Sequence, residues 1–283
     1  MNNFAYRRKR LYCENISVEE ICKKIGTPFY LYSSKQILDN LRLLSKKFKG
    51  CNILIAYAVK ANSNKAILKL LAKNGAGADV VSYGEMKRAL EAKISANKIV
   101  FSGVGKTESE IAKAIEHKIL QFNIESYQEF LAIEKIARQK KIKANIAIRI
   151  NPDVIAGGHP KISTGKKTDK FGVSPEEALK IYLLAKQFPY LNIVGVDMHI
   201  GSQILQIKPF KSAFKKIERF CEKLEKCNIK IKNIDLGGGL GINYSEKKIK
   251  NITDEYTNLV RDIFLRTKKK IIIEPGRFIV ANA

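Results

Sequence analysis

A lysine ends a strongly apolar run in the segment Asn52-Ile-Leu-Ile-Ala-Tyr-Ala-Val-Lys60-Ala-Asn62. A lysine buried among aliphatic neighbours loses solvation of its charged form, so its pKa falls and its neutral amine can attack a carbonyl group. Such an amine can form a Schiff base. The chain contains 52 lysine and arginine residues, however, and most lysines that follow a strand begin a solvated loop. Lys60 alone therefore does not define a site.

Reactive side chains also end other short apolar runs, at Asp79, Arg149, His199 and Glu274. A lone histidine in a strand is more often a satisfied core residue, so its type alone assigns no acid or base role to His199. Glu274-Pro275-Gly276-Arg277 places a carboxylate three residues before a guanidinium. That guanidinium could bind an anion or form a surface salt bridge.

A glycine-rich turn follows a further apolar run, in Asp235-Leu-Gly-Gly-Gly-Leu-Gly241. The backbone amides of Gly237, Gly238 and Gly239 could approach a phosphate without obstruction by side chains. Many such sequences form only tight turns. The place of this turn in the fold decides between the two interpretations.

The elements that position these residues alternate regularly from about Asn52 onward. The predicted strands are 53–59, 78–81, 99–101, 121–124, 146–150, 194–199, 231–236 and 271–274. The predicted helices between them are 65–73, 83–92, 108–116, 127–139, 176–187, 210–226 and 254–264. Eight strands interleaved with helices predict an α/β fold, a (β/α)8 barrel of the TIM type.

In such barrels the active site lies at the carboxyl ends of the strands, and the reactive residues gather there in the predicted fold. The glycine turn follows the seventh strand, where barrel phosphate sites are common. Strand alternation turns Ala147 and Arg149 toward the barrel axis and makes Asp197 and His199 point together. An imine-forming lysine, a phosphate cradle and an inward carboxylate together suggest pyridoxal phosphate chemistry.

The two ends of the chain do not follow the regular alternation of strands and helices. No eighth helix has room before Ala283, so we expect a barrel with an incomplete last helix, from a truncated piece of a longer protein. Residues 1–30 precede the barrel (31–283) and are expected to belong to another domain. A leading helix is predicted at 35–48, with Ser33-Ser34 as its cap.

Composition excludes several function classes. The net charge of +25 could attract nucleic acid or a membrane surface, but the basic residues are scattered without a recognisable binding module. We therefore expect neither partner. No apolar stretch approaches the roughly 20 residues that span a bilayer, and there is no signal-peptide core, so the cytoplasm is the expected location. The five cysteines include no CxxC pair and predict neither a zinc site nor disulfides.

Four motifs resemble the fold type III decarboxylases of pyridoxal phosphate: Ala56-Tyr-Ala-Val-Lys60-Ala-Asn62, His199-Ile-Gly-Ser-Gln203, Gly237-Gly-Gly239 and Glu274-Pro-Gly-Arg277. They occur in the family's order, and the resemblance covers nearly the whole chain. His159-Pro-Lys-Ile-Ser-Thr-Gly165 with Lys170-Phe-Gly172 is most similar to the branch of the family that acts on diaminopimelate.

The resemblance implies a role for each matching residue. Lys60 would hold pyridoxal 5′-phosphate as an internal aldimine, and Glu274 would pair with the pyridinium nitrogen. His199 would stack on the ring and share catalysis with Lys60, while Asp79 and Arg149 would lie near the lysine and the ring. The remaining cofactor contacts would come from Ser202, Gly237, Gly238, Gly239, Pro275, Gly276 and Arg277. Arg277 would also meet the substrate.

The implied activity is decarboxylation of meso-2,6-diaminopimelate to L-lysine, by a homodimer in the full-length form. In the family, a carboxyl-terminal β-domain supplies a proton-donating cysteine in a Cys-Glu-Ser-x-Asp context, and residues 1–30 form part of that domain. Cys221-Glu222 matches only its first two letters, so the chain alone is expected to be inactive. Two alternatives stay open: a decarboxylase of ornithine, arginine or carboxynorspermidine, and a non-catalytic protein that binds the cofactor.

Overall fold

The computed structural model describes residues 3–155, 171–244 and 251–283. Its centre is a closed barrel of parallel strands in the order β10-β11-β4-β5-β6-β7-β8-β9. These strands are β4 (Ile53–Ala58), β5 (Gly77–Val80), β6 (Ile99–Phe101), β7 (Gln121–Ile124), β8 (Ala144–Arg149), β9 (Leu191–Asp197), β10 (Asn233–Asp235) and β11 (Lys270–Ile273). All eight predicted strands are present, and the predicted (β/α)8 barrel is confirmed.

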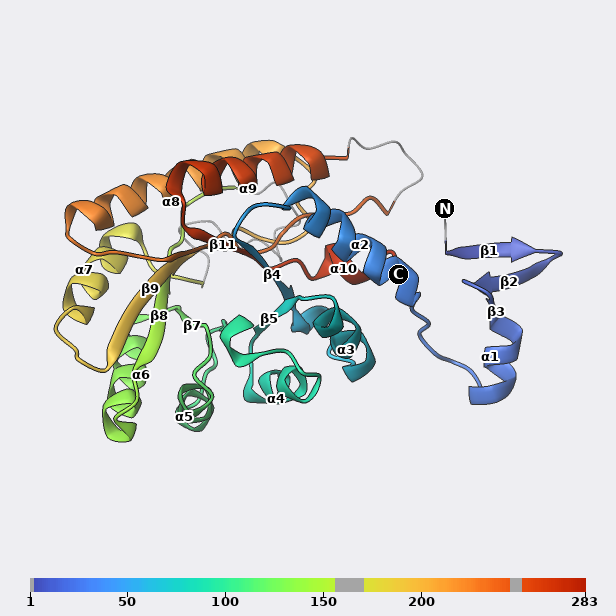
Figure 1. Ribbon diagram of the computed structural model, residues 1–283, viewed down its shortest axis with the longest axis horizontal. Coiled ribbons are helices and arrows are strands. Elements are labelled where there is room, and N and C mark those ends of the chain that lie inside the picture. Colours follow the sequence, from blue (N-terminus) through green and yellow to red (C-terminus); the bar gives the residue numbers. More distant parts are fainter. Residues whose placement is uncertain (1–2, 156–170, 245–250) are drawn as a thin grey trace.

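Helices surround the barrel, and each predicted helix is found within a few residues of its expected bounds (Figure 1). They are α2 (Ser34–Lys47), α3 (Lys65–Lys73), α4 (Tyr83–Glu91), α5 (Glu108–Glu116), α6 (Tyr127–Lys140), α7 (Pro175–Ala185), α8 (Ile207–Lys226) and α9 (Thr253–Thr267). After β11 only the short helix α10 (Arg277–Val280) follows. Two 3-10 turns complete the barrel region: η1 (Val59–Ala61) and η2 (Ala96–Lys98).

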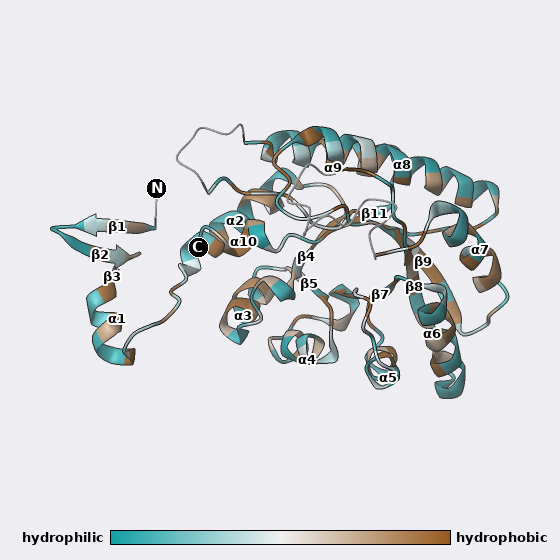
Figure 2. Ribbon diagram, turned by 180° about the vertical axis from the view of Figure 1, so that it is seen from behind, coloured by the Kyte–Doolittle hydropathy of each residue, from teal (hydrophilic) through white to brown (hydrophobic). Residues whose placement is uncertain are grey.

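Strand alternation divides the apolar side chains between two cores. On β4, Ile55 and Tyr57 face outward and join the large cluster between the strands and the helices. Leu54 and Ala56 face inward, where they meet Val100 of β6 in a small cluster inside the barrel. Figure 2 shows the matching colours, with β9 largely brown beside helices of mixed hydropathy. Full burial of one large aliphatic side chain contributes about 1.5–3 kcal/mol.

The barrel interior becomes polar toward the carboxyl ends of the strands. Gln121 and Asn123 point inward from β7, and the Gln121 side-chain amide donates a 2.8 Å hydrogen bond to Asn123 Oδ1. Asn233 of β10 in turn donates to Gln121 Oε1 at 2.9 Å. These hydrogen-bonded side-chain amides extend across the barrel interior, below the reactive residues, and support them.

Several helices after strands begin with the same capping pattern, a hydroxyl residue followed three positions later by glutamate. In α4, Ser82 accepts a hydrogen bond from the backbone N–H of Glu85, and the Glu85 carboxylate accepts one from Val81. Thr107 and Glu110 form a complete capping box in α5. Each such cap stabilises a helix start by about 1 kcal/mol. The caps fix the loops at the carboxyl edge of the barrel, where the site lies.

The segment before the barrel forms a small unit that the sequence did not reveal. β1 (Phe4–Arg7), β2 (Arg10–Cys13) and β3 (Ile16–Ser17) make an antiparallel sheet, followed by α1 (Val18–Ile25). The unit lies outside the ring of helices (Figure 1). Glu14 connects it to α2 by accepting hydrogen bonds from Ser33 Oγ and the Lys35 N–H, both at 2.8 Å. Its assignment to another domain stays a prediction.

The described ranges contain neither a membrane-spanning helix nor a disulfide bond. None of the helices there has the length and apolarity that crossing a membrane requires. All five cysteines carry free thiols, and burial raises the pKa of the Cys221 thiol to about 12.

Candidate active site

A cavity of about 720 Å³ opens at the carboxyl end of the barrel strands. Its lining includes predicted site residues from several separate loops: Lys60, His199, Ser202, Gly239, Glu274, Gly276 and Arg277. Tyr30 and Tyr32, which precede the barrel, and Tyr244 add aromatic walls. The structure therefore brings into one cavity residues that are more than 200 positions apart in the chain.

Lys60 lies in η1, directly after β4, rather than on the strand. Its ammonium group pairs with the buried carboxylate of Asp79 on β5, and 47% of its side chain is exposed. Burial lowers the pKa of Lys60, but the Asp79 and Glu274 carboxylates outweigh burial and raise the pKa to about 12. The expected fall in pKa is therefore wrong: Asp79 holds the amine in its charged form.

Glu274 follows β11 immediately and is buried. Ser102 Oγ and the side-chain amide of Asn123 both lie 3.5 Å from its Oε1 atom. Burial first, and then the negative charges of Asp235 and Asp79, raise the pKa of Glu274 well above its ordinary value. Burial therefore favours the neutral, protonated form of this carboxyl group.

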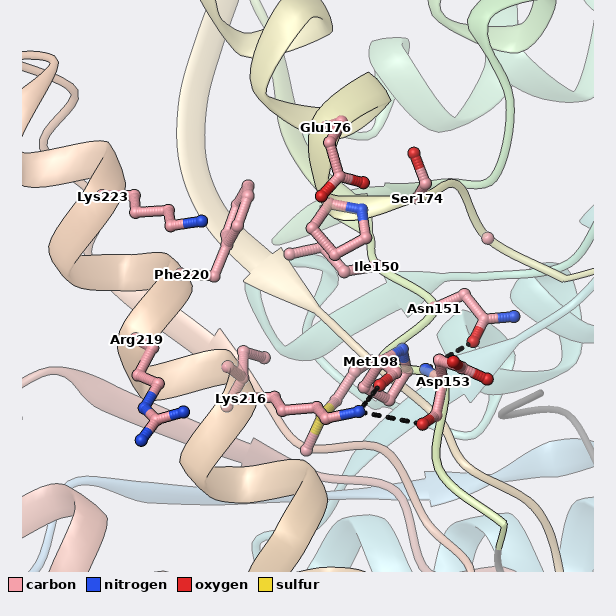
Figure 3. Close-up of a pocket in the computed structure, with 14 residues that line it drawn as sticks. Ile150, Asn151, Asp153, Ser174, Glu176, Met198, Lys216, Arg219, Phe220 and Lys223 are labelled. Carbon is pink, nitrogen blue, oxygen red and sulfur yellow. Dashed lines mark hydrogen bonds between the residues drawn. The ribbon is translucent and has the colours of Figure 1, made fainter. Parts of the chain in front are cut away.

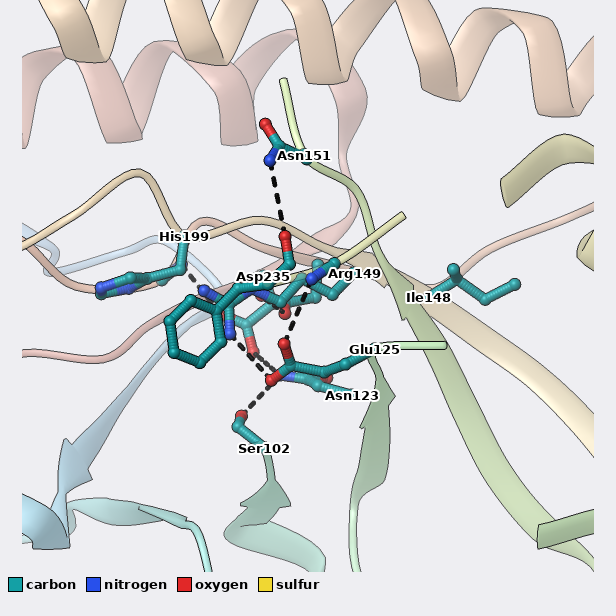
Figure 4. A network of polar contacts seen from close by, with 12 residues as sticks. Ser102, Asn123, Glu125, Ile148, Arg149, Asn151, His199 and Asp235 are labelled. Carbon is teal, nitrogen blue, oxygen red and sulfur yellow. Dashed lines mark hydrogen bonds and ion pairs between the residues drawn. The ribbon is translucent and has the colours of Figure 1, made fainter. Parts of the chain in front are cut away.

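Arg149 ends β8 and points to the barrel axis, as strand alternation predicts, while Ile148 points the other way (Figure 4). Its Nη1 atom lies 2.8 Å from Glu125 Oε1, and its Nε atom lies 4.0 Å from Asp197 Oδ2. The guanidinium carbon also lies 5.2 Å from the centre of the Phe171 ring. Arg149 thus neutralises carboxylates that the closed barrel has removed from water.

His199 lies two residues past the end of β9, so the predicted strand was too long and its alternation does not orient this ring. The ring is held by Gly238, whose N–H donates a 3.0 Å hydrogen bond to Nδ1. Burial, together with the Arg149 and Lys60 charges, lowers the pKa of His199 well below its usual value. The ring is therefore neutral and fixed in the cavity wall.

The glycine turn owes its shape to close backbone packing. A Cβ atom on Gly238 would lie 2.3 Å from the Glu274 carbonyl oxygen, and one on Gly237 would lie 2.5 Å from that of Met198. The Gly237 N–H donates to Asp235 Oδ1 at 3.1 Å. The amides of Gly237 and Gly238 therefore bond within the protein, and Gly239 is the member of the turn that lines the cavity.

Replacement of Gly238 by alanine is expected to lower the free energy of unfolding by about 1–3 kcal/mol or more, because the new methyl group meets backbone rather than a flexible side chain. Gly105→Ala is the matched control, since nothing lies within 4 Å of a Cβ atom there. Denaturant unfolding of both variants measures the difference. Equal stability of the two would show that the turn is not closely packed.

The contacts of Arg277 indicate whether an anionic cofactor fits the cavity. Its Nη1 atom donates a 2.7 Å hydrogen bond to the Tyr244 hydroxyl, and its buried Nε atom has no hydrogen-bond partner among the described residues. A buried donor without a partner costs free energy. The cavity also contains Ser202, Gly239 and Gly276, so this orphaned donor fits a phosphate or carboxylate group.

Some residues of the site were missed from sequence. Asn123 and Glu125 hold Glu274 and Arg149, and Asp235 was noted only as the start of the glycine turn. Strand alternation on β7 could have identified Asn123 as inward-facing, since it separates Phe122 from Ile124. The segment 159–165 and position 170, which carry one of the sequence motifs, lie outside the described residues.

A second cavity, of about 440 Å³, lies between α7 and α8. None of the predicted cofactor-site residues lines it. Figure 3 shows Lys216 reaching across it, where its ammonium group donates to the carbonyl oxygens of Pro152 at 2.7 Å and Asp153 at 2.9 Å. Lys216 thus ties α8 to the loop after β8.

Comparison with known proteins gives the class first. Residues 34–281 match the family described as pyridoxal-dependent decarboxylase, pyridoxal binding domain. The chain belongs to this family, and the barrel with its lysine cavity corresponds to the pyridoxal binding domain.

Within the family, the chain is similar to proteins named diaminopimelate decarboxylase. It is 45% identical to that of Aquifex aeolicus over 98% of this chain and 66% of the relative, and 42% identical to that of Pseudomonas fluorescens over 100% and 68%. The crystal structure of diaminopimelate decarboxylase from Helicobacter pylori with L-lysine superimposes with a TM-score of 0.90 at 44% identity, covering 93% of this chain and 67% of that one. The chain thus spans about two thirds of the length of these relatives.

Proposed function

We propose that the barrel binds pyridoxal 5′-phosphate through Lys60 and serves the decarboxylation of meso-2,6-diaminopimelate to L-lysine and carbon dioxide. The observation that carries the proposal is the meeting of Lys60, Glu274 and the orphaned donor of Arg277 in one cavity. The family match and the names of the relatives support the cofactor and the substrate. When bound, the cofactor supplies an electron sink for the carbanion that departing carbon dioxide leaves.

Asp79, Glu274 and His199 have separate roles in the proposed reaction. Asp79 keeps Lys60 charged and in place, and is the nearest acceptor for the proton that the amine loses before it attacks a carbonyl carbon. Glu274 would pair with the ring nitrogen of the bound cofactor and control its proton. Neutral His199, held by Gly238, would stack its ring against the cofactor ring.

A second set of residues that line the cavity would bind the anionic groups of cofactor and substrate. Arg277, whose Nε donor lacks a partner among the described residues, would hold the phosphate together with Ser202, Gly239 and Gly276, which line the same cavity. Arg277 also lies where a substrate carboxylate could be received, beside Tyr244. Gly237, Gly238 and Pro275 shape these loops; the carbonyl of Pro275 accepts a 3.3 Å hydrogen bond from Ala58.

Substrate choice is tested by carbon dioxide release from carboxyl-labelled amino acids, using the protein loaded with pyridoxal phosphate. We expect diaminopimelate to react at least about a hundredfold faster than ornithine or arginine, because a site built to bind a polar group rejects analogues that lack it. Faster release from ornithine or arginine would assign another substrate. Cofactor binding without release from any of them would favour a non-catalytic protein.

Other features of the family stay predictions for this chain. We propose that the protein is a homodimer of the cytoplasm. Sedimentation at several protein concentrations measures its oligomeric state directly.

A further inference from the structure

Three buried carboxyl groups meet at the carboxyl ends of the neighbouring strands β9, β10 and β11. An oxygen atom from each of Asp197, Asp235 and Glu274 lies within 4.8 Å of the other two. Their exposed fractions are 2%, 0% and 5%, so water cannot screen their charges. Such a group of carboxylates must either hold protons or receive cations.

The nearby cations are already engaged. Lys60 pairs with Asp79, and Arg149 lies 2.8 Å from Glu125 but 4.0 Å from Asp197. Within the described part of the chain, no ion pair reaches Asp235 or Glu274.

Asp235 receives closer hydrogen bonds than Glu274, whose donors, Ser102 Oγ and the Asn123 side-chain amide, lie 3.5 Å away. Asp235 accepts hydrogen bonds from the Gly237 N–H at 3.1 Å and from the Asn123 side chain at 3.2 Å. An oxygen atom of Asp235 also lies within 4.8 Å of one of Glu274. Two buried carboxyl groups this close cannot both ionise easily, so one of them holds a proton, and the closer hydrogen bonds to Asp235 assign this proton to Glu274.

Electrostatics agree with this geometry. Burial raises the pKa of Asp235 to about 7, and burial with the Asp235 charge raises that of Glu274 well above its ordinary value. Two carboxylates in contact cannot both ionise easily. The other titratable or charged groups that face the pair are Lys60, Asp79, Arg149, Asp197 and Tyr256.

We propose that Asp235 and Glu274 share one proton, and that Asp235 is a positioning residue that keeps Glu274 protonated until a ring nitrogen can take that proton. The transfer breaks the O–H bond of Glu274 and forms an N–H bond on the ring, so protons and charge balance without a further reactant. Asp235 then stays charged, held by Gly237 and Asn123. This deepens the proposed function, on which the role of the ring nitrogen rests.

The shared proton is tested without cofactor, so its failure is distinguishable from failure of the proposed function. The 283-residue chain is labelled with carbon-13 at glutamate side-chain carboxyls only, and nuclear magnetic resonance follows their titration between roughly pH 5 and pH 9. Glu274→Gln assigns the signal. We expect Glu274 to stay protonated to a higher pH than an ordinary glutamate, which ionises near about 4.3.

Asp235→Asn then tests the positioning role. The amide keeps the shape of the carboxylate but removes its charge and can donate to Glu274, so the pKa of Glu274 should fall by about one unit or more. Asp197→Asn is the matched control, because it removes a buried carboxylate of the same cluster, and it should give a smaller shift. Circular dichroism checks that each variant is folded.

Two results would overturn the proposal. One is a wild-type Glu274 that is ionised throughout the titration, which decides the matter even if Asp235→Asn does not fold. The other is a folded Asp235→Asn variant in which Glu274 titrates as in the wild type. A further readout is proton release when pyridoxal phosphate is added in weak buffer, which should differ between the wild type and Asp235→Asn at the same pH.

Discussion

Lys60→Ala is expected to abolish the absorbance of lysine-bound cofactor when pyridoxal phosphate is added to the chain. Among the residues that the structure describes, Lys60 supplies the lysine amine that lines the cavity together with Glu274 and Arg277. Without it no covalent link forms at this site, although the phosphate group can still bind. A visible absorption titration of wild type and variant measures the loss, which we expect to be complete.

Lys65→Ala is the control for nonspecific reaction, which is a concern in a chain with 52 basic residues. Lys65 begins α3 only five positions later and forms an ion pair with Glu91 at the surface. This variant should keep the full absorbance. If Lys60→Ala keeps it too, the assignment of Lys60 is wrong.

Arg149→Met is expected to lower the free energy of unfolding by about 3–5 kcal/mol, the usual cost of removing one partner from a buried ion pair. Methionine fills much of the space but leaves Glu125 and Asp197 without their cation. Arg138→Met serves as control, because the Arg138 side chain is 62% exposed and its pair with Glu134 is worth little. Denaturant unfolding measures both.

The deficit of Arg149→Met should grow as pH rises. Burial and Asp235 already raise the pKa of Asp197, and loss of the Arg149 charge raises it further. An acid whose pKa is raised in the folded state stabilises the fold below its unfolded pKa and loses that contribution as pH rises through the folded pKa. The unfolding free energy of the variant should therefore fall more steeply than that of the wild type from about pH 5 upward. Parallel curves would contradict the role of Arg149 as counter-ion.

The barrel was predictable because its signals are local and repeated. Apolar runs such as 53–58 and helix caps such as Ser82 with Glu85 each follow from a few adjacent residues. Positions near strand ends followed from strand order: Asp79 lies on β5, Arg149 lies on β8, and Lys60 lies in η1 directly after β4.

The electrostatics of the site were not predictable in the same way. The apolar neighbours of Lys60 along the chain suggested a lowered pKa, but the deciding groups are Asp79 and Glu274, which come from other strands. The same holds for Asp235, whose partners Asn123 and Glu274 are 112 and 39 positions away. Charges that meet only across the barrel cannot be inferred from local sequence.

The unit before the barrel was also missed. β3 has only two residues and leaves little local signal. α1, by contrast, has Val18, Ile21 and Ile25 at helical spacing, a signal that could have predicted it. His199 was assigned to a strand because apolar residues continue on both sides of it, whereas the ladder ends at Asp197.

The assignment of Lys60 is tested most directly by reducing the complex of the chain and pyridoxal phosphate with borohydride and locating the modified lysine by peptide mass spectrometry. Reduction fixes the cofactor on whichever amine has bound it. We expect modification in the tryptic peptide that contains Lys60, at about one cofactor per chain when the cofactor is limiting, and none at this position in Lys60→Ala. Modification concentrated on another lysine, with Lys60 unlabelled, would contradict the assignment.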